Sequence, residues 1–260
     1  MLEIVHIDEA PVARRRYLNA ARGGGTEVGH LAIERGRVRA LPADLDAVVL
    51  TSDLQGIVPD PHTREATLLG VAVAEALEEL AFDAVLPPAA RTGVILAGDL
   101  YSVPAADKRG GFGGVEAVWA AFADRFAWVV GVAGNHDDVT AVAQDERVVV
   151  LDEAVVELDG LRLGGVGLVA GNPAKRGRRA EADQLDRIAL VAVAGVDVLV
   201  LHEGPHGDAD QRGQPRIRAI VEAHRVPLTV CGHDHWPRAL AHHEHGQILN
   251  VDARVVVLTR

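Results

Sequence analysis

Residues 46–53 read DAVVLTSD, a short run of aliphatic and β-branched residues that passes directly into a serine and an aspartate. Such a run predicts a buried strand with polar residues at its carboxyl end. Four later segments have the same form and end in Asp, Asn or His: residues 93–99 (GVILAGD), 127–136 (AWVVGVAGNH), 196–202 (VDVLVLH) and 227–235 (PLTVCGHDH). Because open α/β sheets carry their ligand sites at the carboxyl ends of strands, we expect the five ends to converge.

Helical periodicity separates these predicted strands. In residues 64–82, apolar side chains recur at helical spacing, with Glu75, Glu78 and Glu79 on the opposite face, which predicts an amphipathic helix. Alternation of strands with helices favours a largely parallel sheet covered by helices. Further helices are predicted at residues 115–126, 182–194 and 216–224. Short strands that would add antiparallel pairs and a second sheet are predicted at residues 155–158, 161–169, 247–251 and 255–258.

The first 45 residues follow a different pattern. Residues 2–7 predict a strand, residues 11–21 predict a basic helix, and the glycines at 23–25 predict a break. We expect this segment to be an N-terminal appendage packed on a single domain that spans residues 1–260. One domain is expected because 260 residues, 48% of them hydrophobic, suffice for one full core.

Charge and cysteine content restrict the class of protein. The formal net charge of −11 repels polyanions, so constitutive nucleic-acid binding is not expected. Cys231 is the single cysteine of the sequence, which excludes an internal disulfide. Neither an apolar leader nor an apolar span of membrane length is present, so we expect a cytoplasmic protein without membrane contact.

The polar residues at the five strand ends are carboxylates, amides and imidazoles, without a cluster of thiols. That set suits borderline or hard divalent cations and not a sulfur-bound structural zinc. In chain order the segments are Asp53-Leu54-Gln55, Gly98-Asp99, Gly134-Asn135-His136-Asp137, His202 and Gly232-His233-Asp234-His235. The set resembles the calcineurin-like metallophosphoesterases, whose ordered pattern is Asp-x-His, Gly-Asp, Gly-Asn-His-Asp/Glu, His and Gly-His-x-His. The resemblance covers about residues 46–236.

The resemblance implies both a fold and a metal centre. The fold would be an α/β, four-layer α/β/β/α sandwich of two mixed sheets flanked by helices. Two divalent metal ions would hold a hydroxide that attacks phosphorus. His136 would give a proton to the leaving group, and Asp137 would orient His136. The ligands would be Asp53, Gln55 and His235 for the first ion, Asn135, His202 and His233 for the second, and Asp99 as the bridge.

Gln55 departs from the family pattern, which has histidine at that position. A neutral amide oxygen is a harder and weaker ligand than imidazole, so the first ion should be held less tightly. We therefore expect Mn²⁺ or iron at this site, with Mg²⁺ and Zn²⁺ as the alternatives. A branch of the superfamily with a similar variant includes manganese-dependent diphosphatases. The alternative interpretation is that Gln55 is a bystander and that the centre holds one ion well.

The function that this resemblance implies is metal-dependent hydrolysis of a phosphoester. Residues 98–104 read GDLYSVP and lack the Gly-Asp-x-Val-Asp-Arg-Gly of protein Ser/Thr phosphatases. A phosphodiesterase or phosphatase acting on a small nucleotide-like substrate is therefore expected, and two metal ions would supply attraction that the acidic chain does not. The alternatives are a DNA- or RNA-end phosphodiesterase and a non-catalytic binding module on the same fold.

Several residues outside the five segments are candidates for substrate contacts. The basic run in residues 175–179 could grip phosphate through Lys175 and Arg176, or could be a solvated loop. His206 and Tyr101 each lie shortly after a predicted ligand and could reach substrate. The histidine-rich residues 242–245 are expected to form a solvated loop rather than a metal site. The sequence does not indicate an oligomeric state.

Overall fold

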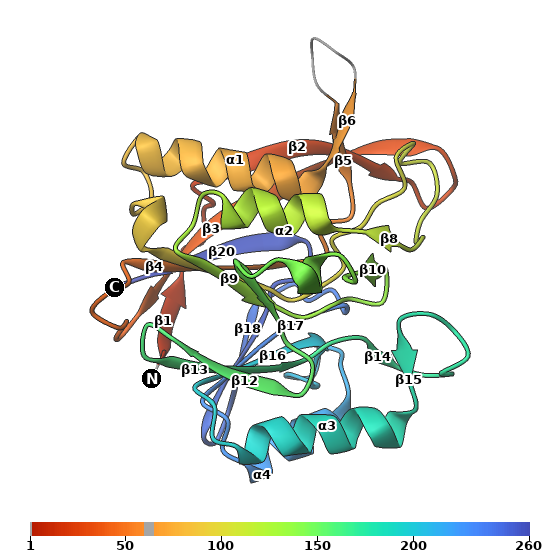
Figure 1. Cartoon of the computed structure of the whole chain (residues 1–260). Helices are drawn as coiled ribbons and strands as arrows, with labels where there is room; N and C mark the ends of the chain where they lie inside the picture. The colour runs from red at the N-terminus through yellow and green to blue at the C-terminus, as the bar shows by residue number, and fades with distance from the viewer. Residues whose placement is uncertain (1, 60–64) are drawn as a thin grey trace.

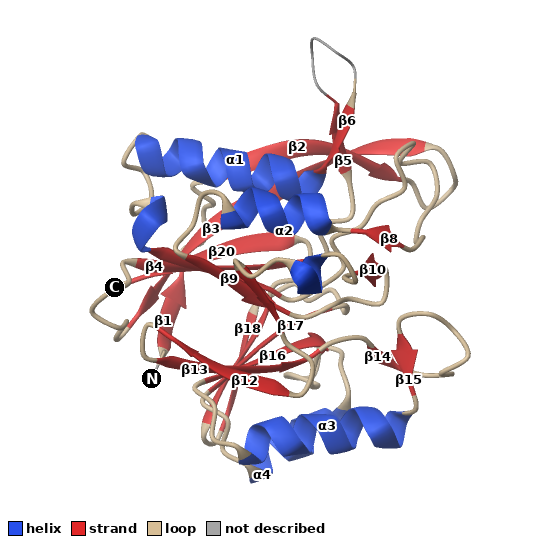
Figure 2. Cartoon of the chain, viewed as in Figure 1, coloured by secondary structure: helices blue, strands red, loops and turns tan. Residues whose placement is uncertain are grey.

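Two large β-sheets face each other, and helices cover both outer faces, so the molecule has four layers (Figures 1 and 2). This arrangement comes from a computed structural model that describes residues 2–59 and 65–260. Helices α1 and α2 cover the first sheet, and α3 and α4 cover the second. The four-layer sandwich expected from the sequence is thus confirmed. The helices are α1 (Leu69–Phe82), α2 (Glu116–Ala123), α3 (Glu181–Val193) and α4 (Pro215–Ala223), with 3₁₀ turns η1 (Ala89–Arg91) and η2 (Val142–Gln144).

The first sheet has ten strands in the spatial order β11-β9-β7-β4-β20-β3-β2-β5-β6, with β1 paired to β3. Neighbours β4, β7 and β9 are parallel, and their carboxyl ends therefore lie at one edge of the sheet. The bounds are β1 (Ile4–Ile7), β2 (Ala13–Ala20), β3 (Thr26–Val38), β4 (Ala47–Ser52), β5 (Ile57–Pro59), β6 (Ala66–Leu68), β7 (Thr92–Leu96), β9 (Trp128–Gly131), β11 (Val148–Val150) and β20 (Arg254–Thr259).

The second sheet has six strands in the order β12-β13-β16-β17-β19-β18. Strands β13, β16, β17 and β19 run parallel to one another, while β12 and β18 add antiparallel edges. The bounds are β12 (Ala154–Leu158), β13 (Leu161–Val166), β16 (Val198–Glu203), β17 (Leu228–Gly232), β18 (Leu240–His243) and β19 (Gly246–Asn250). Two short pairs complete the set, β8 (Gly113–Gly114) with β10 (Asp137–Asp138) and β14 (Val169–Ala170) with β15 (Arg178–Arg179).

The central strands are apolar on both faces because each sheet lies between two layers. In β4, Val48 and Leu50 belong to the core between the sheets, whereas Ala47 and Val49 belong to the core under α1 and α2. Strand β16 alternates in the same way between the inter-sheet core and the core under α3 and α4. Side chains of successive strand residues point to opposite faces, so a doubly covered strand appears in the sequence as an unbroken apolar run.

The N-terminal segment differs from its prediction. The basic helix expected at residues 11–21 is wrong, because these residues form β2, which pairs antiparallel with β3 from Ala13–Ile33 to Ala20–Thr26. Arg14 and Arg16 are exposed while the residues between and beside them are half-buried, which is the period of a strand. Through β3, this hairpin continues the first sheet beside β20.

Two boundaries also differ from prediction. Helix α1 begins at Leu69, after β6, and not at residue 64, which lies outside the described residues. The strand expected at residues 161–169 is divided into β13 and β14. In the part of the chain that is described, no helix has both the length and the apolar character needed to cross a bilayer.

Candidate metal centre

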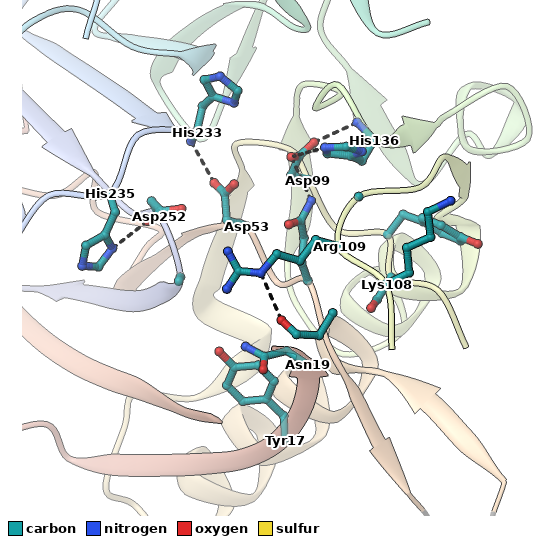
Figure 3. A pocket seen from close by; sticks show the side chains of 16 residues that line it. Tyr17, Asn19, Asp53, Asp99, Lys108, Arg109, His136, His233, His235 and Asp252 are labelled. Carbon is teal, nitrogen blue, oxygen red and sulfur yellow. Dashed lines mark hydrogen bonds and ion pairs between the residues drawn. The ribbon is translucent and has the colours of Figure 1, made fainter. Parts of the chain in front are cut away.

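The five predicted strand ends converge at one place, as expected. Asp53 and Gln55 follow β4, Asp99 follows β7, and His233 and His235 follow β17. These side chains, together with His136 after β9, line a cavity of about 430 Å³ (Figure 3). Asn135 and His202 are buried beside the cavity, with 9% and 0% of their surface exposed. The carboxyl ends of parallel strands from both sheets therefore build one polar site.

The residues expected to hold the second ion form a compact group. Asp99, His202 and His233 each offer a ligand atom, and these atoms lie within 4.8 Å of one another. His202 Nε2 is 3.4 Å from Asp99 Oδ1 and 3.3 Å from Asn135 Oδ1. His202 Nδ1 lies 2.8 Å from the carbonyl of Ala97, an acceptor that fixes the ring and turns Nε2 toward the group. The geometry of this group fits a divalent cation.

The residues expected to hold the first ion do not form a second group of this kind: among the described residues, the ligand atoms within 4.8 Å of one another are those of Asp99, His202 and His233, without Asp53 or His235. Gln55 Nε2 donates to Asp99 Oδ2 at 3.0 Å. Asp53 Oδ2 accepts the hydroxyl of Ser52 at 2.5 Å and the backbone amide of His233 at 2.9 Å. The His235 ring contacts Asp252. These oxygens and the imidazole are a harder donor set than that of the second group.

The backbone is strained at three of the expected ligands. Asp53, Asp99 and His233 have φ of 54°, 56° and 69°, in the left-handed region that non-glycine residues rarely adopt. Such residues cost about 1–3 kcal/mol each and are concentrated at functional sites. Gly134 is required beside them, because an added Cβ would lie 2.1 Å from the backbone nitrogen of Asp99. The chain thus gives up stability to aim these side chains at one point.

Burial and mutual charge shift the pKa values within this group. Burial raises the pKa of Asp53 well above its ordinary value, although the charge of His202 opposes the rise. Burial also opposes ionisation of Asp99, but the nearby His202 and His136 lower its pKa overall. For His202, burial lowers the pKa while Asp99 and Asp53 raise it, and the net result is a pKa of about 10. Without cations the group retains protons, which bound metal ions would replace.

His136 lies at the cavity wall in a position suited to proton transfer. Its Nδ1 is 2.6 Å from the carbonyl of Gly111, and its Nε2 is 3.9 Å from Asp99 Oδ2. The side chain is 26% exposed, so Nε2 can reach a molecule in the cavity. The backbone amide of His136 donates to Asp99 Oδ1 at 2.9 Å, which also ties this loop to the expected bridging carboxylate.

Asp137 does not make the contact with His136 that the sequence suggested. Its carboxylate is buried and accepts backbone amides of Leu100 at 2.8 Å, Tyr101 at 3.1 Å and Gly134 at 3.0 Å. Burial and the charge of Asp99 raise its pKa to about 6, while the amides oppose that rise. Asp137 therefore joins the loops after β7 and β9, and the carbonyl of Gly111 orients the His136 ring.

The candidate substrate contacts divide into two groups. Tyr101 lines the cavity, whereas Lys175, Arg176 and His206 do not. Arg176 instead lies over the ring of Phe112, 5.3 Å from its centroid. The cavity also has a set of lining residues that the sequence did not single out, namely Tyr17, Asn19, Ala20, Ser102, Lys108, Arg109, Gly110, Asp252 and Ala253. Tyr17 and Asn19 belong to β2, and the sequence did not indicate their place at the site because it predicted a helix there.

Comparison with known proteins supports this fold. The family model described as calcineurin-like phosphoesterase matches residues 47–237. No curated protein matches the chain. Among solved structures, the chain is similar to TT1561 of Thermus thermophilus, with a TM-score of 0.53, 16% identity, and coverage of 80% of this chain and 90% of that one. A second is AQ665 of Aquifex aeolicus, a protein of unknown function, with a TM-score of 0.35, 15% identity, and coverage of 81% and 95%.

The family match extends over more than half of the chain and includes each strand end of the metal centre. The Thermus thermophilus structure supports the fold alone. Since the family match implies metal-dependent hydrolysis of phosphoesters, the geometry of the centre and the comparison point to the same chemistry. The chain belongs to the calcineurin-like phosphoesterase family.

Proposed function

We propose that this protein is a metal-dependent phosphodiesterase or phosphatase that acts on a small nucleotide-like substrate. The observation that carries the proposal is the convergence of Asp99, His202 and His233, whose ligand atoms lie within 4.8 Å of one another. Gln55 and Asp53 lie next to this group on the same cavity. A binding module that had lost catalysis would be expected to lack some of these ligands or His136, and only Gln55 deviates from the family pattern.

Two divalent ions would use these donor atoms, and the compact group of Asp99, His202 and His233 supports one of the two sites. Asp53, Gln55 and His235 would hold the first, and Asp99 would lie between the two. The buried pair Asn135 and His202, with His233, would hold the second. When bound, the ions would activate water and neutralise charge on the phosphoryl oxygens. The harder donors of the first site favour Mn²⁺ or iron over Zn²⁺.

The protein's own residues complete the reaction. Backbone amides hold the two carboxylates in place: the amide of His136 donates to Asp99, and the amide of His233 donates to Asp53. His136, with Nδ1 held by Gly111, presents Nε2 to the cavity and would protonate the leaving oxygen. The cavity of about 430 Å³ is within the range of small-molecule sites, which supports a metabolite-sized substrate over a long polyanion. A nucleic-acid end is the second candidate, and it is disfavoured by the net charge of −11.

The test is hydrolysis of bis(p-nitrophenyl) phosphate and p-nitrophenyl phosphate by chelator-treated protein, with Mn²⁺, Fe²⁺, Mg²⁺, Zn²⁺ or no metal restored. We expect turnover that requires metal and that falls by about 10²–10⁴-fold in His136→Ala. His224→Ala is the matched control, because His224 is exposed at the end of α4 and does not line the cavity. Absence of turnover with every metal, or full activity of His136→Ala, would contradict the proposal.

A further inference from the structure

The cavity beside the metal centre has two chemically different walls. One wall consists of the expected ligands together with Asp252, and it carries the acidic side chains. The other wall comes from β2 and from the loop after β7, and its polar side chains include Tyr17, Asn19, Lys108 and Arg109. Among the described lining residues, this second wall contributes no carboxylate. It offers hydrogen-bond donors and positive charge within an acidic protein of net charge −11.

Arg109 projects between the two walls. Figure 3 shows its side chain between Asn19 and Asp53. Its Nε donates to the carbonyl of Ala20 at 3.1 Å, and one terminal nitrogen is 3.9 Å from Glu27. The side chain is 56% exposed, so most of the guanidinium donors remain available to a molecule in the cavity. The planar guanidinium binds phosphate through two parallel hydrogen bonds, and the adjacent Lys108 adds a second positive charge.

Tyr17 is held rigidly at this wall. It is paired with Gly29 across the β2–β3 hairpin. An added Cβ at Gly29 or at Gly56 would lie 2.4 Å from the Tyr17 ring, so the two glycines make the space that the ring occupies. Burial raises the pKa of Tyr17 against the smaller opposing effect of the Asn19 side chain, which keeps the hydroxyl a hydrogen-bond donor. The ring is therefore fixed at the cavity wall.

Asn19 has unused hydrogen-bonding capacity at the same wall. Its Oδ1 is buried and has no hydrogen-bond partner within the described residues. An amide oxygen accepts hydrogen bonds, so it suits a hydroxyl or N–H group of a substrate and not a phosphate oxygen.

We propose that Lys108 and Arg109, together with Tyr17, bind a second phosphate group of the substrate, separate from the phosphoryl group that is hydrolysed. This inference rests on the proposed function and narrows its substrate class to molecules that carry two phosphates. The metal ions would neutralise the phosphate that reacts, whereas the donor wall would select substrates by the phosphate that does not. The hairpin formed by β2 and β3 is then a specificity element of the active site.

A matched pair of substrates tests the proposal. Thymidine 5′-(p-nitrophenyl phosphate) and the same compound with a 3′-phosphate have the same scissile bond and the same chromophore. With Mn²⁺-loaded protein, we expect kcat/KM to be at least about tenfold higher for the 3′-phosphorylated compound, mainly through a lower KM, because a remote phosphate is bound equally in the ground state and the transition state.

Three variants test whether the donor wall causes the preference for the 3′-phosphorylated compound: Arg109→Lys, Lys108→Ala and Tyr17→Phe. We expect Arg109→Lys and Lys108→Ala to reduce the preference to near one, and Tyr17→Phe to reduce it partly. Arg22→Lys is the control for Arg109→Lys, since Arg22 is exposed in the turn of the same hairpin and does not line the cavity.

Three results would overturn the inference. One is the absence of preference in the wild-type protein despite metal-dependent turnover, which would leave the proposed function standing. Another is an equal loss of kcat on both substrates in Arg109→Lys, which would show that Arg109 only ties its loop to Ala20. The third is the absence of metal-dependent hydrolysis of either compound and of both simple chromogenic esters, which would remove the proposed function as well.

Discussion

His235 Nδ1 lies 2.8 Å from Asp252 Oδ2, although the two residues are 17 positions apart. The His235 side chain is 70% exposed while that of Asp252 is 12% exposed, so the carboxylate is the fixed partner. An isolated parallel β-bridge pairs the backbone of Ser52 with that of Asp252, which places Asp252 beside the end of β4. With Nδ1 held in this way, Nε2 of the ring is left for a metal ion, an arrangement that many metal-binding histidines share.

Asp252→Asn should therefore weaken the first metal site. We expect a loss of about 10–100-fold in affinity for Mn²⁺, because the ring would lose its orientation and some of its basicity. The measurement is competition between the protein and a chromophoric chelator. Asp210→Asn serves as the control, since Asp210 is exposed and pairs with Arg238. Equal affinities in Asp252→Asn and the wild type would show that Asp252 does not act through His235.

Asp99→Asn should abolish most of the activity. The substitution preserves shape but removes the negative charge that faces His202 and His136. We expect kcat to fall by at least about 10²-fold and the number of bound ions per chain to drop, as measured by initial rates and elemental analysis. Asp138→Asn is a suitable control, because that carboxylate accepts the Thr140 amide instead. Normal rates with normal metal content in Asp99→Asn would disprove its bridging role.

Gln55→His should change metal preference. Imidazole is a softer and stronger ligand than an amide oxygen, so the first site should bind more tightly and shift toward Zn²⁺. Binding isotherms for Mn²⁺ and Zn²⁺ in the wild type and the variant measure this shift. If both affinities are unchanged, Gln55 is a bystander and the centre holds one ion, which is the alternative interpretation of the sequence.

The stability of the metal-free protein should decrease at alkaline pH. The pKa of His202 is raised to about 10 in the folded state, above its ordinary value of 6.5, so the folded state binds the proton more tightly than the unfolded state. This contribution is complete below about pH 6.5 and is lost as the pH rises toward 10. We expect the free energy of unfolding to fall by roughly 2–5 kcal/mol across that range.

Urea unfolding of chelator-treated protein at a series of pH values measures this effect. Protein loaded with Mn²⁺ is the control. A histidine bound to metal is already neutral, so the stability of the loaded protein should not decrease through loss of the His202 proton. Identical pH profiles for the two forms would mean that His202 is not protonated in the metal-free site.

Asp137→Ala should mainly reduce the stability of the folded protein. The carboxylate accepts amides from Leu100, Tyr101 and Gly134, and removal would leave buried donors without partners. We expect a loss of roughly 2–5 kcal/mol in the free energy of unfolding, measured in urea. The neighbouring Asp138→Ala should cost far less, since Asp138 is only partly buried. Similar losses in the two variants would contradict the structural role assigned to Asp137.

The sequence was sufficient to predict the centre of the fold. Strands such as β4 and β16 are covered on both sides, so they leave an apolar run that is visible without any structure, and Asp53 and His202 mark where each run ends. Helices α2, α3 and α4 were predicted within a few residues of their bounds, because their apolar periodicity is local. These features depend on neighbours in sequence.

The features that were missed depend on partners distant in sequence. The run ARRRYLNA of β2 has residues that are favourable in helices, and only its pairing with β3 makes it a strand. Asp252 follows a strand in a turn, and nothing local indicates that it will contact His235. Conversely, the basic run at Lys175 and Arg176 was conspicuous in the sequence, yet these residues do not line the cavity.

The position of β20 in the first sheet has a consequence for how the molecule acquires its structure. Residues 254–259 form a strand between β3 and β4, which come from residues 26–38 and 47–52. During synthesis on the ribosome, the hairpin of β2 and β3 therefore has no strand that joins it to β4 until more than 200 further residues have been made. Pairings this distant in sequence form slowly, and unpaired edges of nascent strands are prone to aggregate. Expression at lower temperature or with chaperones should raise the soluble yield of this protein.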